Sequence, residues 1–118
     1  MLIGELAKAT GTTKDTIRHY HQQGLLIVSK RAAGSRTYND YPYENIDRIG
    51  MIKYGKTMGF TLSEMTSLQE VYYSGKLSTQ EQIQILNDKL SLIEQKIHGL
   101  NQIRTSIHNK LSILKDQD

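Results

Sequence analysis

The 118-residue chain contains no cysteine and no tryptophan, and only one proline and one phenylalanine. Without cysteine it cannot form disulfides, thiolate metal sites or a cysteine nucleophile. No apolar run approaches the roughly 20 residues that cross a bilayer. The first residues also lack the basic and apolar segments of a secretory signal. We therefore expect a protein that has no membrane partner and stays in the cytoplasm.

Recognisable catalytic patterns are missing too. The sequence has no Gly-rich phosphate loop, no Gly-x-Ser-x-Gly elbow and no His-Glu-x-x-His motif. His19 and His21 are two residues apart and His98 and His108 ten apart, and neither spacing brings two side chains to one metal on a helix. We expect no enzyme activity, no metal and no cofactor.

The basic residues are concentrated in the first half of the chain. Residues 1–60 carry nine Lys and Arg against five acids, whereas residues 61–118 carry six against seven. Hydrophobic residues make up only 37% of the chain, which is few for a self-contained core. The composition indicates a first half that meets a polyanion and a chain that gains stability from a partner copy.

The first 26 residues predict two short helices around a glycine turn. Ile3, Leu6 and Ala7 form one apolar face before residues 10–12, which break the pattern. A second helix is expected over 13–23, opened by a capping box at 12–15, with Ile17 and Tyr20 facing inward. This order is typical of a helix-turn-helix, whose second helix enters the major groove of DNA.

A basic hairpin, or wing, is predicted over about 27–39. The apolar run 25–28 and the pair 37–38 are expected to be extended on either side of a basic tip. Asn39 is then expected to cap a third helix that has Pro42 in its first turn. The side chains of this third helix that are expected to face inward are Tyr43, Ile46, Ile49 and Ile52. A fourth helix is expected to follow, opened by a capping box at Thr61–Glu64.

The stretch 78–115 carries the most regular pattern. With Ile83 at heptad position a, nine of the ten a and d positions are aliphatic, and a continuous helix is about 57 Å long. Such a seam needs a second copy, so a coiled-coil dimer is predicted, with an intramolecular hairpin bent at Gly99 as the alternative. Arg104, at the tenth position, favours an antiparallel pair. The interface residues are Leu86, Leu90, Ile93, Ile97, Leu100, Ile107, Leu111 and Leu114.

Several side chains in the first half are candidates for DNA contacts. Thr13, Lys14 and Thr16 open the second helix and are expected near base edges, while Arg18 lies further along and suits phosphate. In the wing, the predicted contacts to the backbone or the minor groove are Arg31, Arg36 and Tyr38. Tyr38 has an alternative role as a core residue that anchors the wing.

These motifs together resemble the MerR family of transcription regulators. The resemblance covers about residues 2–70, in order and at the family's spacing. The segments that carry it are 3–8, 10–11, 15–20, 24–26, 34–38, 52–53, residue 56, and 58–65, that is IGELAK, TG, DTIRHY, GLL, GSRTY, IK, K and MGFTLSEM. Where the family has two aromatic residues after Arg18, this chain has His19 and Tyr20, and Ile27-Val28 replaces the usual prolines.

The resemblance implies a mainly α fold, with a winged helix-turn-helix domain over 1–75 and an antiparallel coiled-coil dimerisation helix over 76–118. It implies a homodimer that binds and distorts double-stranded promoter DNA on which RNA polymerase also sits. His19 and Tyr20 join the expected DNA contacts, and Lys53 and Lys56 are expected to hold phosphates.

The resemblance leaves the signal open. Metal-sensing relatives place cysteines where this chain has Leu77, Ser78 and Ser112. A small ligand, a partner protein or no effector at all remain as alternatives. Two other functions also remain: an architectural or excisionase-like DNA-bending protein without promoter regulation, and a coiled-coil interaction protein that does not bind DNA.

Overall fold

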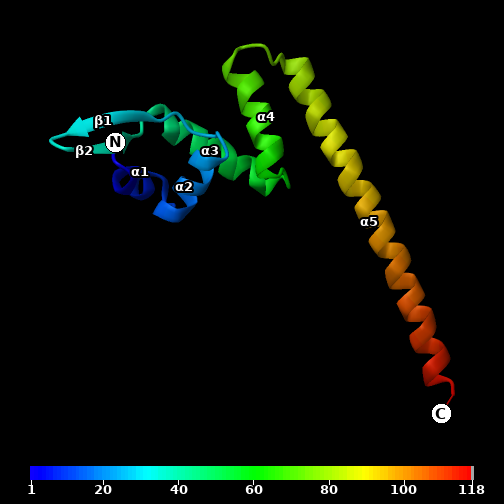
Figure 1. Cartoon of the computed structure of the whole chain (residues 1–118). Helices are drawn as coiled ribbons and strands as arrows, with labels where there is room; N and C mark the ends of the chain where they lie inside the picture. Colours follow the sequence, from blue (N-terminus) through cyan, green and yellow to red (C-terminus); the bar gives the residue numbers. More distant parts are fainter. Residues whose placement is uncertain (118) are drawn as a thin grey trace. The chain divides into compact units, whose positions relative to one another are not determined.

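The computed structural model describes residues 1–117, and the chain divides into two compact units between Lys76 and Leu77. We call the first unit the head. It holds four helices and a two-stranded antiparallel hairpin, and the second unit is a single helix (Figure 1). In chain order the elements are α1 (Ile3–Thr10), α2 (Lys14–Gln22), β1 (Ser29–Ala33), β2 (Arg36–Asp40), α3 (Glu44–Thr57), α4 (Leu62–Tyr73) and α5 (Thr79–Lys115).

The turn between α1 and α2 follows the prediction with one change. Gly11 ends α1 in the left-handed conformation, with φ of 64°, which favours glycine. Thr13, not Thr12, caps α2: its Oγ1 accepts a 3.1 Å hydrogen bond from the Thr16 amide. The predicted capping box at 12–15 is therefore wrong by one residue. Asp15 instead lies in the first turn of α2, where its charge complements the helix dipole.

The predicted wing is present, and the pair 37–38 lies in β2 as expected, but the first strand lies later than predicted. Residues 25–28 do not form a strand, and β1 begins at Ser29. The basic residues therefore lie within the strands, and the turn between them contains Gly34, with φ of 65°. Because the partners in an antiparallel ladder share a face, the register that pairs Arg31 with Tyr38 puts a cation beside an aromatic ring on one side of the hairpin.

The start of α3 corrects two predictions. Asn39 lies in β2 and caps nothing, and α3 begins only at Glu44. Tyr43, predicted to face the core, is 76% exposed. Three-residue steps rotate a helix by about 300° each, so Tyr43 and Ile52 lie on opposite sides. The residues of α3 that are buried are Asn45, Ile49, Ile52 and Gly55.

The head closes its own core. Leu6, Ile17, Leu25 and Ile49 are fully buried, which joins α1, α2, the segment before the wing and α3 around one centre. Helix α4 completes the core by close approach to α3. A β-carbon added at Gly55 would lie 2.3 Å from the Met65 sulfur, so any larger residue there forces the Met65 side chain to move.

Helix α5 has no buried residue at all. Ser78 and Glu81 form the predicted capping box, and the helix then runs 37 residues without interruption, about 55 Å at 1.5 Å per residue. Since it passes straight through Gly99, the intramolecular hairpin is wrong. Every predicted interface side chain is at least 37% exposed in the single chain. No helix within residues 1–117 is long and apolar enough to span a membrane.

Candidate nucleic-acid interface

Helix α2 presents two cations on one of its faces. Lys14 and Arg18 are four residues apart, so their side chains point to the same side, and both are exposed. Arg18 donates a 2.8 Å bond to Asp15, but the two side chains are 56% and 94% exposed, so water screens this pair and an incoming anion competes for Arg18. Thr13 and Thr16 are joined through their hydroxyls at 2.9 Å and belong to the cap of the helix.

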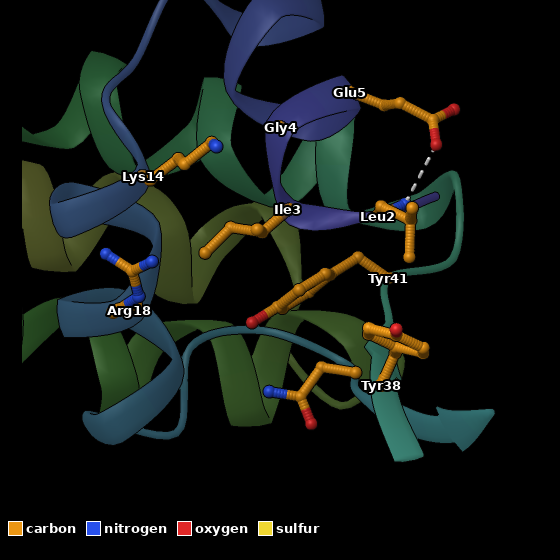
Figure 2. A pocket seen from close by; sticks show the side chains of 9 residues that line it. Leu2, Ile3, Gly4, Glu5, Lys14, Arg18, Tyr38 and Tyr41 are labelled. Atoms are coloured by element: carbon orange, nitrogen blue, oxygen red, sulfur yellow. Dashed lines mark hydrogen bonds between the residues drawn. The ribbon is translucent and has the colours of Figure 1, made fainter. Parts of the chain in front are cut away.

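A cleft of about 670 Å³ lies between α2, the start of α1 and the wing. Figure 2 shows Lys14 and Arg18 reaching into it from α2, with Ile3 and Gly4 of α1 along one wall and Tyr38 on the opposite side. The lining is completed by Leu2, Glu5, Asn39 and Tyr41. The fold thus brings three of the predicted DNA contacts, from two elements, to one opening.

The wing carries its cations outward. Arg31 and Arg36 are exposed, and Tyr38 is 41% exposed, so the alternative role of Tyr38 as a core residue is wrong. Lys30 is a basic residue that the prediction missed: its Nζ donates a 2.6 Å bond to Asn39 across the hairpin. The alternation of side chains along β1 places Lys30 on the face opposite Arg31, so both faces of the wing are basic.

Lys53 and Lys56 on α3 already have partners inside the head. The Lys53 ammonium donates to the Thr10 carbonyl, at the C-terminal end of α1 where helix carbonyls are unpaired. Lys56 lies over the Tyr20 ring, 5.6 Å from its centre. Both lysines are exposed, so each ties helices together and keeps its charge at the surface.

The adjacent residues His19 and Tyr20 separate in the structure. His19 is exposed on α2 and remains a candidate contact. Tyr20 is only 3% exposed and packs in the core, which corrects its assignment as a DNA contact. Because the Lys56 ammonium lies over the Tyr20 ring, Tyr20 helps to position that lysine at the surface.

Asn45 fixes the root of the wing and was not predicted. It is fully buried, and its side-chain amide makes two bonds to the backbone of Ile27: Oδ1 accepts from the amide at 2.8 Å and Nδ2 donates to the carbonyl at 2.7 Å. By bonding both the N–H and the C=O of Ile27, the Asn45 side chain takes the place of a neighbouring β-strand. Hydrophobic periodicity contains no signal for such a residue.

At the root of the wing, the end of β2 is held by charge. The Met1 ammonium donates to an Asp40 carboxylate oxygen at 2.8 Å and to the Tyr41 carbonyl at 2.7 Å. The bond from that ammonium, helped by the charge of Arg31, holds the pKa of Asp40 below its ordinary value. The buried Tyr41 lies edge-on to His21, with its hydroxyl 3.3 Å from Nδ1.

Metal-ligating side chains do not cluster in the part of the chain that the structure describes. The chain has no cysteine, and in residues 1–117 no three His, Asp or Glu side chains gather in a way that could hold an ion. Leu77, Ser78 and Ser112 provide no thiolate ligands.

Comparison with known proteins decides the family. The model of the MerR HTH family regulatory protein matches residues 1–70, and that of the MerR DNA-binding region matches residues 46–109. The chain belongs to the MerR family. It is therefore a DNA-binding transcription regulator, and regulators of this family bind promoter DNA as homodimers. The match favours this function over the architectural alternative.

Two MerR-family relatives and one solved structure show how far the likeness extends. The ZntR homolog of Haemophilus influenzae is 35% identical over 91% of this chain and 78% of its own. The mercuric resistance operon regulatory protein of Bacillus cereus is 33% identical over 86% and 75%. The lead(II) complex of PbrR691 from Ralstonia metallidurans CH34 has a similar fold, with a TM-score of 0.81, 23% identity, and coverage of 92% of this chain and 84% of that one.

Proposed function

We propose that the MerR-family dimer formed by this chain reads two half-sites of one operator, each head placing α2 in a major groove and its wing on the adjoining backbone. The observation that carries this proposal is the shared cleft: Lys14 and Arg18 from α2 and Tyr38 from β2 border one opening. Two cations and a phenol that converge from two elements fit a backbone phosphate between the groove and the wing.

The proposed contacts differ in what they read. His19 projects from the exposed side of α2 toward base edges, while Thr13 and Thr16 keep the first turn of that helix in place. Arg18, the wing cations and the lysines of α3 neutralise phosphates and carry no sequence information. In the wing and on α3 these cations are Arg31, Arg36, Lys53 and Lys56.

Binding distorts the promoter in this proposal. Two heads joined through paired helices have a fixed separation, so they fit half-sites about one turn of DNA apart, roughly 34 Å, or a multiple of it. If the duplex must bend to meet both heads, the deformation costs on the order of 1–6 kcal/mol, which the extra contacts offset. A distorted promoter spacer is then realigned for RNA polymerase, and the protein acts in the cytoplasm, beside the chromosome.

The proposed signal is not a metal ion bound through thiolates. Two of the relatives are named for mercuric resistance and for a lead(II) complex, whereas this chain has no cysteine. Any small-molecule signal for this chain would bind through oxygen, nitrogen or apolar groups, and a partner protein or no effector at all stay as alternatives.

Selection of bound duplexes from a random pool tests the proposal. We expect two inverted half-sites at a fixed separation, and a promoter fragment with that site should migrate anomalously in a circular-permutation gel assay for bending. The double variant Lys14→Ala/Arg18→Ala should fail to enrich any motif. Lys115→Ala, on the last turn of α5, is the matched control and should select the wild-type site. Selection of a lone half-site, or of none, contradicts the proposal.

A further inference from the structure

The apolar seam of α5 and its one charged interruption specify how two copies pair. The a and d side chains are exposed in the single chain, from 37% for Ile93 to 64% for Leu100. Arg104 occupies the remaining a position, and it forms no ion pair within residues 1–117. A partner helix must cover the seam and also receive this guanidinium.

A parallel pairing fails at Arg104. In register, each a residue faces the same residue of the other copy, so two guanidinium groups would meet in the middle of the seam. An antiparallel pairing sets a positions against d positions instead, and Arg104 then faces an aliphatic residue.

Among antiparallel registers, one pairs every seam position. The ten a and d positions are symmetric about the midpoint between His98 and Gly99. A shift by one heptad in either direction leaves two positions of each copy without a partner. The matched layers, each present twice, are Ile83 with Leu114, Leu86 with Leu111, Leu90 with Ile107, Ile93 with Arg104 and Ile97 with Leu100 of the partner subunit.

The same register supplies a charge partner for Arg104. Opposite it lies Ile93 of the partner subunit, and the next residue is Glu94, at the flanking e position, also unpaired within the described chain. The two shifted registers do not do this. One places Arg104 opposite Leu86, where the flanking e residue is the neutral Asn87, and the other places it opposite Leu100, where that residue is Asn101 and the second Arg104 is close.

We propose that the antiparallel pair of α5 helices implied by the family resemblance is centred on the midpoint between His98 and Gly99, with Arg104 of each copy bound to Glu94 of the partner subunit. The inference rests on the proposed function only in assuming that the chain dimerises through α5. It adds the register, which fixes the distance between the starts of the two α5 helices, to each of which a head is joined.

Disulfide trapping in the full chain tests the register, because the natural sequence has no cysteine that would interfere. The double variant Ile93→Cys/Arg104→Cys should cross-link into dimers under mild oxidation at least about fivefold faster than Leu86→Cys/Arg104→Cys, which reports one shifted register. Within one chain the two cysteines are about 16 Å apart along α5 and cannot join. Faster trapping of the Leu86 variant overturns the proposal, as does efficient self-trapping of Arg104→Cys alone, which indicates a parallel pair.

Charge exchange tests the ion pair separately. Glu94→Arg should weaken dimerisation roughly tenfold by sedimentation equilibrium, because both symmetric pairs are lost. Glu94→Arg/Arg104→Glu should recover to within about threefold of the natural protein. The matched control Gln95→Arg, at the outward f position, should change little. Equal weakening by the two single arginine variants, or no recovery, contradicts the pair. A natural protein that stays monomeric and ignores every duplex would instead contradict the proposed function.

Discussion

The head and α5 solve the problem of burying apolar surface in opposite ways. The head has ten buried hydrophobic residues and closes its core within one chain, although its only sheet is a two-stranded hairpin. Helix α5 carries a row of nine aliphatic residues along one face, and none of them is buried in the single chain. We therefore expect the first unit to fold alone, and the second to reach its full stability only when a second copy covers it.

The difference also divides the work of a MerR-family regulator. Contacts to a single half-site depend on side chains fixed by the core of the head. The spacing between half-sites depends on the pairing of α5. A substitution in one unit should therefore leave the property of the other unit intact, and the following variants test that separation.

The largest effect is expected from Leu100→Lys. Leu100 lies next to the proposed symmetry midpoint, and its two copies would bury two unpaired ammonium groups, a cost of several kcal/mol. The dimer should become monomeric in sedimentation, and binding to a two-half-site operator should be lost. The head should keep its thermal transition in the same protein.

The control for this variant is Gln102→Lys, at an outward heptad position on the same helix. It should stay dimeric and bind the operator. If Leu100→Lys still sediments as a dimer, the heptad assignment is wrong. If its head unfolds, the two units are not independent.

The sequence predicts those parts of the fold that depend on repeated apolar residues or on glycine. Heptad spacing predicts α5 because nine aliphatic residues agree on one period, and a capping box marks its start. The turn between α1 and α2 is predicted because Gly11 and the flanking threonines stop and restart a helix. These signals are local, so no knowledge of tertiary contacts is needed.

The errors occur where polar side chains or distant contacts decide. Asn39 has the chemistry of a helix cap, yet hairpin pairing takes it into β2. The stripe assumed for α3 follows three-residue steps, which rotate Tyr43 away from the face that holds Ile52. The burial of two polar side chains depends on hydrogen bonds to residues far away in sequence: Asn45 bonds the backbone of Ile27, and Gln69 donates to the Arg48 carbonyl.

The residues of the candidate site are predicted from the sequence, but the cleft that they line is not. Lys14, Arg18 and Tyr38 were assigned separately, and only the fold brings them to one cleft. Likewise, no pattern indicates that Lys53 bonds the Thr10 carbonyl. Charge composition identifies the first half as basic, whereas the direction of each charge depends on packing.

A smaller effect, confined to the head, is expected from Asn45→Ala. The change leaves the amide and carbonyl of Ile27 without their partner in a buried site, which should lower the free energy of unfolding of the head by roughly 2–4 kcal/mol. Dimerisation through α5 should be unchanged. Chemical denaturation measures the first property and sedimentation the second.

Asn45→Asp separates the two bonds in that site. The carboxylate keeps an acceptor for the Ile27 amide but has no donor for its carbonyl, and it buries a charge unless it takes up a proton. Its loss of stability should therefore be greater at pH 8 than at pH 5. A loss that is the same at both pH values argues against a direct contact with the Ile27 carbonyl.

Gly55→Ala tests the contact between α3 and α4. The added methyl group meets the Met65 side chain at 2.3 Å, and the free energy of unfolding of the head should fall by about 1–3 kcal/mol. The matched control is Gly50→Ala, on the same helix with open space around it, which should be neutral or slightly stabilising. Similar thermal shifts for both variants would show that α4 does not pack closely at Gly55.

The smallest expected change in stability belongs to Arg18→Ala, whose main effect should be a change in the salt dependence of DNA binding. Its pair with Asp15 is more than half exposed, so its removal should change the free energy of unfolding by less than about 1 kcal/mol. If Arg18 neutralises a phosphate in each head, affinity should fall for every duplex, and the slope of log affinity against log salt should decrease by about one per head. Arg104→Ala, a cation lost from α5, should leave that slope unchanged while weakening the dimer. A slope that stays the same for Arg18→Ala would remove this arginine from the interface and leave the cleft to Lys14 and the wing.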